Sequence, residues 1–303
     1  MIHIIISAYG EPTSTERAVN LFLNQNIKEK FKIIVMDPFP KVKEYLTKKF
    51  GKIKEFEFFE DPGEGKSYAL NLILEKIYSE NKNDIIILTD GDVFVNENSV
   101  QEIITAFKNP NVGCVGGRAI PLDNRNEKYG YWARFTFAGI DKVRRKLSKE
   151  KKFFECSGYL FAIRNGLIKE FSLKASEDAV MPYLIWEKGY LIQYIPSAEV
   201  YVKNPSNLKE YISQKRRNIK GHEGLNKIFP KMPRTKSMFN EIKHGWYFLF
   251  LYPKNLKEFF WTIQLYFVRL KIYLITFKEL KEKKEYSDGW RGEDLTPSTS
   301  PLN

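Results

Sequence analysis

Short apolar runs of strand length alternate with segments of helical period along most of this chain, and this alternation limits the fold more than any other feature. Helical periodicity falls at 13–25, 41–50, 67–78, 99–107, 177–187 and 208–220. The strand-like runs between these helices cover 2–7, 32–36, 85–89, 112–117, 158–163 and 191–195. Such alternation predicts an α/β fold with a doubly wound, Rossmann-like and mostly parallel sheet.

One of the strand-like runs ends in two acids, in the sequence Ile85-Ile-Ile-Leu-Thr-Asp90-Gly-Asp92. Ligands of α/β folds bind beyond the carboxyl ends of parallel strands, so we expect Asp90 and Asp92 at a site. Two carboxylates at this spacing can hold one hard divalent cation, Mg²⁺ or Mn²⁺, which would bind a diphosphate. The alternative is a solvated turn in which Asp92 or Asn96 caps the next helix.

Length and charge restrict the function further. A chain of 303 residues can form one large α/β core, or a core with an appendage. The net charge of +12 favours an anionic partner such as nucleic acid, acidic lipid or a phosphate-bearing substrate. Because the basic residues are spread along the chain without a recognition motif, we expect no nucleic acid partner. No signal-peptide pattern precedes the first strand.

Three other patterns do not carry the chemistry they suggest. The segment Gly63-Glu-Gly65-Lys66-Ser67 lacks the first glycine of a nucleotide-binding P-loop, because Glu60 stands there. Phe94 replaces an oxygen ligand that a calcium-binding loop would need after Asp90. The two cysteines, Cys114 and Cys156, lie in apolar segments, which predicts buried thiols in a reducing compartment.

A series of short motifs occurs in a specific order over roughly residues 1–225. In chain order they are Ser7-Ala8-Tyr9-Gly10-Glu11, Asp37, Gly65-Lys66-Ser-Tyr-Ala69-Leu70-Asn71, Asp90-Gly-Asp92, Ser157-Gly158, Glu177-Asp178 and Gln214-x-x-Arg217. This ordered set resembles the family 2 glycosyltransferases of the GT-A fold. Each motif is short, and the order is what gives the resemblance its specificity.

The resemblance implies an inverting transfer of a sugar from a nucleotide donor, UDP-linked, to a hydroxyl acceptor that is lipid-linked or a nascent glycan. It implies that Asp178 is the general base and that Glu177 positions it. Asp90 and Asp92 would ligate Mg²⁺ or Mn²⁺ at the diphosphate. The residues that match donor-binding positions are Ser7, Tyr9, Glu11, Asp37, Lys66, Asp90, Gln214 and Arg217.

Two departures from the family pattern matter. Asn218 stands where processive members carry tryptophan, which indicates a non-processive enzyme. The segment Tyr201-Val-Lys203 occupies the stretch where many relatives have a histidine near the metal. His222 is a substitute third ligand in one interpretation and a structural histidine in the other.

Two alternatives to a glycosyltransferase are open. A nucleotidyltransferase shares the architecture, but it would normally show a glycine-rich basic loop after the first strand, unlike Ser7–Glu11. A non-catalytic carbohydrate- or lipid-binding relative of this fold belongs to another class, and the presence of Asp90, Asp92 and Asp178 argues against it. Release of UDP from nucleotide sugars distinguishes an enzyme from a binding module.

The chain changes character after residue 230. We expect a glycosyltransferase domain over 1–230, an amphipathic helical region over 231–285 that associates with a membrane, and a disordered tail over 286–303. Helical projection gives two apolar faces and two polar seams. The first face has Phe259, Ile263, Tyr266, Phe267, Leu270, Leu274 and Phe277, and the second has Trp261, Leu265, Val268, Ile272 and Ile275. The seams are Thr262/Arg269/Thr276 and Gln264/Lys271/Lys278.

A helix with two apolar faces needs two apolar surroundings. We expect one face on the core and the other in the interface of an anionic membrane, with Trp246 and Trp261 as anchors. The protein would then be cytoplasmic and peripheral, at the inner face of the cell membrane. A helix wedged inside the core is the alternative, a dimer contact is a further one, and the oligomeric state is open. Arg269 and Lys271 would lie near the bilayer centre of a spanning helix, which argues against spanning.

Overall fold

The computed structural model describes residues 1–173, 176–233 and 248–282. Its strands are β1 (Ile2–Ser7), β2 (Phe31–Asp37), β3 (Phe56–Glu60), β4 (Ile85–Asp90), β5 (Phe94–Val95), β6 (Val112–Pro121), β7 (Leu160–Arg164) and β8 (Leu191–Val202). Its helices are α1 (Pro12–Leu23), α2 (Pro40–Phe50), α3 (Lys66–Lys76), α4 (Ser99–Ala106), α5 (Lys128–Lys149), α6 (Glu177–Glu187), α7 (Leu208–Ile228), α9 (Phe248–Leu251) and α10 (Leu256–Lys281).

The strands form one sheet in the order β3-β2-β1-β4-β7-β6-β8-β5. The pairs β1–β2, β1–β4, β2–β3 and β6–β8 are parallel. Strand β7 runs antiparallel to both β4 and β6, and β5 runs antiparallel to β8. The expected α/β architecture is therefore present, with a sheet that is more mixed than the sequence predicts.

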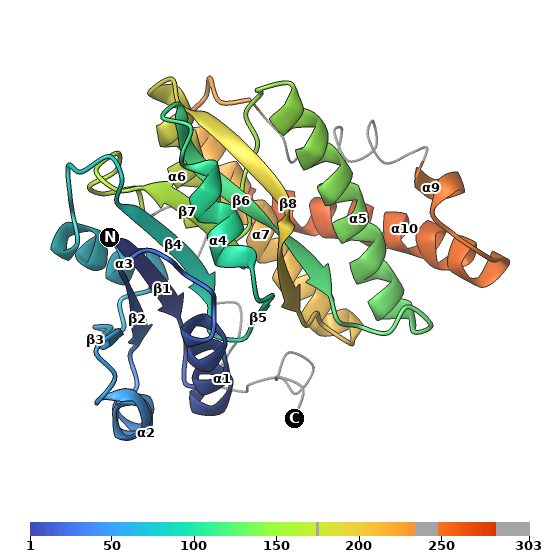
Figure 1. Cartoon of the computed structure of the whole chain (residues 1–303). Helices are drawn as coiled ribbons and strands as arrows, with labels where there is room; N and C mark the ends of the chain where they lie inside the picture. The colour runs from blue at the N-terminus through green and yellow to red at the C-terminus, as the bar shows by residue number, and fades with distance from the viewer. Residues whose placement is uncertain (174–175, 234–247, 283–303) are drawn as a thin grey trace.

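Helices cover both faces of this sheet (Figure 1). Alternate residues of each strand point to opposite faces. In β1, Ile4 and Ile6 join a core with α1, α2 and α4, whereas Ile5 joins a second core with α3 and α6. The arrangement aligns the carboxyl ends of β1, β2 and β4 at one edge, where the predicted donor-binding and acidic residues follow the strands.

Cys114 and Cys156 are both free and fully buried in the second core. Their sulfur atoms lie 3.6 Å apart, which is a hydrogen-bond contact between two thiols and is too long for a disulfide bond. Burial raises the pKa of the Cys114 thiol well above its ordinary value, so this thiol stays protonated and unreactive. The expected buried thiols are confirmed, and the reducing compartment stays a prediction.

Several elements differ from the sequence expectation, and the short strand β5 is one that was not expected. Helix α5 was not expected. Its side chains pack against all three cores: Phe137 against the first, Leu147 against the second, and Tyr131 and Trp132 in a third. Strand β3 is an edge strand of half-exposed residues. Strand β8 continues past Pro196, where its register with β6 shifts between Gly117 and Arg118. Proline has no backbone N–H to donate to the neighbouring strand, and the register shift accommodates the missing hydrogen bond.

The third core joins the C-terminal helices to the rest of the protein. It consists of side chains from α5, α7 and α10, with partly buried aromatic residues of α9 and its neighbouring loop packed against them. Figure 1 shows α10 alongside α5 and α7. The buried members are Tyr131, Trp132, Phe135, Tyr211, Ile219, Leu265, Ile272 and Tyr273. One expected face of α10 is thus on the core.

The sequence predicts that the polar seam Thr262/Arg269/Thr276 separates the two apolar faces. In the structure, part of this seam lies in the core contact instead. Thr262 and Thr276 are fully buried in the contact with the core. Their hydroxyls donate to the carbonyls of Glu258 and Ile272, four residues earlier, at 2.9 and 2.8 Å. A threonine satisfied in this way can enter a core contact. The expected anchor Trp246 and the expected tail over 286–303 lie outside the described residues.

Within the described part of the chain, no helix has the length and hydropathy that a membrane-spanning segment requires.

Candidate active site

Two neighbouring parallel strands end at the site. Ser7, the last residue of β1, stands in register with Asp90, the last residue of β4, and the amide of Gly91 donates to the Ser7 carbonyl at 2.8 Å. The Ser7 hydroxyl is buried and has no hydrogen-bond partner among the described residues. A buried hydroxyl without a partner is costly, so it is available to a ligand. Asp92 follows Asp90 by one turn residue.

Lys66 links two acids that are distant in the sequence. It is the first residue of α3, and its Nζ lies 2.7 Å from Asp90 Oδ1 and 2.6 Å from Glu177 Oε1. Burial raises the pKa of both carboxyls, and Lys66 acts against that shift. Burial opposes the charged amine as well, but the two carboxylates outweigh it and raise the pKa of Lys66. Lys66 therefore stays cationic and holds both acids.

Asp178 is held in a defined orientation at the start of α6. Its Oδ2 accepts from the Gly158 amide at 3.0 Å, and its Oδ1 accepts from the Ser176 hydroxyl. The Cys156 amide donates to the Asp178 carbonyl at 3.0 Å, which joins the segment before β7 to α6. The carboxylate is bound through a backbone donor and a hydroxyl, without a cation in either contact.

Gly158 marks the point where three carboxylates converge. A Cβ atom on this glycine would lie 3.4 Å from Glu177 Oε1 and 3.9 Å from both Asp178 Oδ2 and Asp90 Oδ2. A larger residue would occupy the space among the three acids. Glycine at 158 thus lets the carboxylates of β4 and α6 lie close to the backbone that precedes β7.

Two arginines flank the acids from the helices. Arg217 of α7 lies close enough to Asp90 to lower the pKa of that carboxyl, against the larger effect of burial. Burial lowers the pKa of Arg17 on α1, and the charge of Asp92 partly offsets this. Arg17 also stacks over the Phe94 ring at 4.3 Å. Gln214, one turn before Arg217, is buried, and its Oε1 has no hydrogen-bond partner in the described chain.

A second group of predicted residues forms the loops after β1 and β2. Asp37 is fully buried, and its two oxygens accept from the amides of Gly10 and Phe39, each at 2.8 Å. Burial raises the pKa of Asp37 despite these donors. Tyr9 is 59% exposed and meets the Phe39 ring edge-on, with centroids 5.0 Å apart. Glu11 accepts from the Ser14 hydroxyl at 3.0 Å, in the first turn of α1.

The structure thus brings Lys66, Asp90, Glu177 and Asp178 together, with Arg217 beside them. Of the other expected donor residues, Ser7, Tyr9, Glu11 and Asp37 lie at the ends of β1 and β2 and in the loops that follow, and Gln214 lies on α7. Sequence reasoning missed Arg17 and Asp61. Asp61 follows β3, accepts from the Gly63 amide at 2.8 Å, and is close enough to Asp37 to raise its pKa. The available signal for Asp61 was an acid directly after a strand. For Arg17 the sequence offers no signal except its position in a predicted helix.

The carboxylates at this end of the sheet fit a divalent cation site that substrate phosphates would complete. Asp90 and Asp92 are two adjacent carboxylates, and no group of three or more acid, histidine or cysteine side chains that could hold a metal occurs in the described ranges. His222 Nδ1 lies 3.2 Å from Glu155 Oε2, and both residues are buried. Mg²⁺ is commonly held by one or two carboxylates together with substrate phosphates, which matches this pair.

Comparisons with known proteins give a matching family model and similar solved structures. The family model described as "Glycosyltransferase like family 2" matches residues 2–221, from β1 into α7. A solved structure of GalNAc-T7 with UDP, GalNAc and Mn²⁺ is similar with a TM-score of 0.47 and 15% identity. That alignment covers 81% of this chain and 55% of the other, so this chain spans about half of its length. Among the curated proteins, no sequence matches this chain.

Proposed function

Because the chain belongs to the family 2 glycosyltransferases, we propose that it transfers a sugar from a UDP-linked donor to a hydroxyl acceptor with inversion at the anomeric carbon. The observation that supports this most is the convergence of Asp90, Glu177 and Asp178 around Gly158, at the carboxyl ends of the sheet. Ligands of open α/β sheets bind in this position.

The donor would occupy the edge from the loops of β1 and β2 to Asp90. Tyr9 and Phe39 offer exposed aromatic surface for the base, next to a loop that Asp37 fixes by accepting two amides. Asp37 in this role shapes the binding surface, and its direct contact with the base or ribose stays a prediction. The Ser7 hydroxyl is an unsatisfied group at the same edge.

Asp90 and Asp92 would hold Mg²⁺ or Mn²⁺, and a bound cation would offset the negative charge that develops on the leaving diphosphate. The chain's own cations contribute to the same end. Arg217 lies near Asp90, and its guanidinium can pair with phosphate oxygens in two parallel hydrogen bonds. Arg17 lies near Asp92 and is the second candidate for that contact. Gln214 would donate or accept beside them.

Asp178 is the proposed general base. It would take the proton of the acceptor hydroxyl while the oxygen attacks the anomeric carbon and the C–O bond to the diphosphate breaks on the opposite face. The Gly158 amide and Ser176 hydroxyl hold the carboxylate for this step. Glu177 is paired with Lys66 and buried, so it is suited to positioning and not to proton transfer.

The acceptor is proposed as lipid-linked or a nascent glycan, and the transfer as non-processive. Asn218 of α7 follows Arg217 directly, and its short amide lacks the aromatic surface on which a growing sugar polymer could stack. A lipid-linked acceptor would require the enzyme to work at a membrane, and we propose the cytoplasmic side.

Release of UDP from a panel of UDP-sugars tests this function. The wild-type protein with Mn²⁺ should release UDP, and EDTA should abolish the release. Asp178→Asn should lower the rate by roughly 10²–10⁴-fold, the usual contribution of a general base. Unchanged turnover in EDTA would remove the cation from the mechanism. No UDP release from any donor, together with tight UDP binding, would instead indicate a non-catalytic relative.

A further inference from the structure

Helices α9 and α10 present a continuous line of exposed apolar side chains, which we call the apolar stripe. In α10 its members recur every three, four or seven residues and therefore share one side of the helix. The Phe250 ring of α9 lies 6.2 Å from the Phe259 ring of α10, so the two helices contribute to one surface. The stripe consists of Phe250, Leu251, Leu256, Phe260, Phe267, Leu270, Leu274 and Phe277, with 39–77% of each side chain exposed.

The stripe is not exposed because α10 has been placed with the wrong side toward the core. The opposite side of α10 is the buried one, where Leu265 and Ile272 enter the third core. Thr262 lies on that side too, and its Oγ1 forms a 2.6 Å hydrogen bond with the Tyr131 hydroxyl. Because the inner face is both apolar and hydrogen-bonded, rotation of α10 to bury the stripe would break these contacts.

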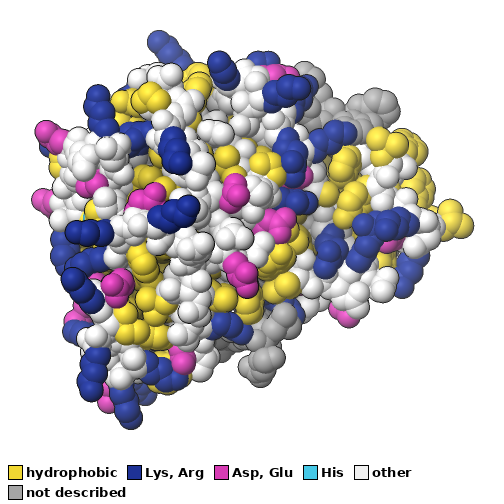
Figure 2. Space-filling model, viewed as in Figure 1, with side chains coloured by type: hydrophobic (Ala, Val, Ile, Leu, Met, Phe, Trp, Pro, Cys, Tyr) yellow, Lys and Arg dark blue, Asp and Glu magenta, His cyan; other side chains and the backbone are white. Residues whose placement is uncertain are grey.

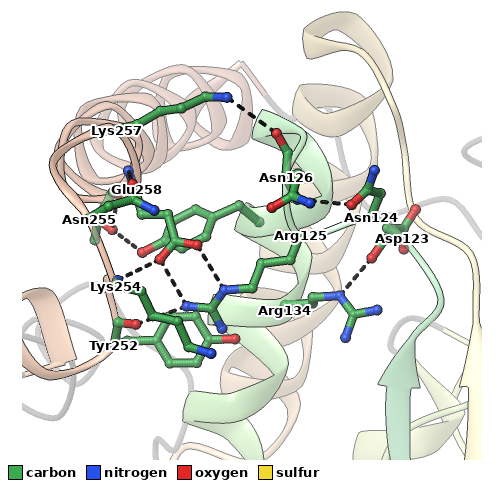
Figure 3. Close-up of polar contacts among 12 residues, drawn as sticks. Asp123, Asn124, Arg125, Asn126, Arg134, Tyr252, Lys254, Asn255, Lys257 and Glu258 are labelled. Atoms are coloured by element: carbon green, nitrogen blue, oxygen red, sulfur yellow. Dashed lines mark hydrogen bonds and ion pairs between the residues drawn. The ribbon is translucent and has the colours of Figure 1, made fainter.

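Ion pairs fix both ends of α10 in this orientation. At the N-terminal end, Arg125 donates to both oxygens of Glu258, at 2.8 and 2.9 Å, and Asn255 caps the helix (Figure 3). At the C-terminal end, Glu279 pairs with Arg216, and its other oxygen lies 3.1 Å from Lys220 Nζ. Residues of the β6–α5 loop and of α7 thus hold the helix with the stripe facing outward.

The exposed charges within α10 have one sign. Both glutamates within α10, Glu258 and Glu279, are engaged on the inner side. Apart from Gln264, each residue classed as exposed in α10 is either apolar or a lysine. Figure 2 shows hydrophobic side chains together with lysine and arginine at this end of the molecule. The lysines are Lys257, Lys271, Lys278 and Lys281.

We propose that the apolar stripe docks the protein on an anionic phospholipid bilayer, with α10 lying in the interface plane. A single 26-residue helix, about 39 Å long, offers a long narrow apolar line, which suits a flat interface better than a protein groove. Lysines beside the stripe match anionic head groups. In a two-fold contact between copies they would face one another and repel. The docking does not depend on sugar transfer, so its test needs no substrate.

Flotation with vesicles of phosphatidylglycerol and phosphatidylcholine tests the proposal. The wild type should float with these vesicles at low salt, and less with phosphatidylcholine alone or at high salt. The double variant Phe267→Gln/Leu274→Gln should lose about tenfold or more in partitioning, because two exposed apolar groups no longer enter the lipid. Its control, Leu173→Gln/Leu208→Gln, changes two exposed apolar residues outside α9 and α10 and should float like the wild type.

Three results would overturn the docking. The first is wild-type protein that stays at the bottom with anionic vesicles. The second is a stripe variant, folded by circular dichroism, that floats as well as the wild type. The third comes from light scattering: a wild-type dimer that becomes a monomer in the stripe variant would identify the stripe as a contact between copies. We expect the same mass for both proteins.

Lys271→Glu/Lys278→Glu should weaken binding to anionic vesicles specifically.

Discussion

At the residue scale, Gly158 offers the sharpest test of where a ligand binds. A Cβ atom there would make only ordinary contacts, the nearest at 3.4 Å from Glu177 Oε1, so Gly158→Ala should fold. The methyl group would nevertheless occupy the space among three carboxylates. We expect kcat/KM for UDP-sugar turnover to fall by about tenfold or more, since small displacements at a reacting centre are costly.

Gly139→Ala is the matched control for this substitution. Gly139 lies in α5, and a Cβ there would meet nothing within 4 Å. Alanine in a helix is about 0.5–1 kcal/mol more favourable than glycine, so this variant should gain slightly in Tm at unchanged activity. Full activity of Gly158→Ala would show that the convergence point of the acids is not occupied during turnover.

The residues of the site were predictable to an unequal extent. Asp90 was predictable because an acid after a buried strand must lie at the sheet edge, and Asp178 because it matches a motif in a fixed order. The link from Lys66 to Glu177 was not, since it depends on how α3 and α6 approach across the sheet. The position of Arg17 at the site could not be predicted for the same reason, because Arg17 lies on α1 and its neighbour Asp92 follows β4.

At the scale of the element, the ion pair of Arg125 and Glu258 makes a pH-dependent contribution to stability. The hydrogen bond from Arg125 lowers the pKa of Glu258 below its ordinary value of 4.5. A carboxyl with a lowered pKa stabilises the fold above its unfolded pKa, and this is lost as the pH falls through the folded value. Glu258→Gln should cost about 1.5–3 kcal/mol in the free energy of unfolding at neutral pH.

Urea unfolding of the wild type and Glu258→Gln across pH measures this directly. The difference between the two proteins should be full at neutral pH and shrink below 4.5, the ordinary glutamate value. Glu150→Gln is the control, because Glu150 pairs with Lys152 on an exposed surface, where ion pairs contribute little. A difference that stays constant down to acid pH would mean that the charge of Glu258 does not hold α10.

The predictability of the elements follows from their surroundings. Strands β1 and β4 lie in the middle of the sheet and read as continuous apolar runs, whereas β3 at the edge does not. Helix α10 was expected with two apolar faces, and the structure has one of them on the core. Helix α5 was not expected, and its residues pack against all three cores.

At the scale of the whole molecule, the expected α/β fold of the glycosyltransferase type is confirmed by the sheet and by the family match over residues 2–221. The C-terminal helices lie beyond that match, yet α10 shares a core with α5 and α7. Helix α7 carries Gln214 and Arg217 on one part of its surface and the partners of Glu279 on another. The helix proposed to dock on a membrane, α10, is therefore also paired with α7, the helix that carries Gln214 and Arg217.

The carboxylates at the sheet edge are proposed to divide their work between donor and acceptor, and calorimetric titration with UDP and Mn²⁺ separates the two roles. The wild type should bind UDP with Mn²⁺ and much more weakly in EDTA. Asp92→Asn should weaken UDP binding by about tenfold or more, a loss of about 1.4 kcal/mol or greater. Asp178→Asn should bind UDP with the wild-type Kd, because its carboxylate is proposed to act on the acceptor. Equal UDP binding by wild type and Asp92→Asn, or loss of binding in Asp178→Asn, would contradict this division.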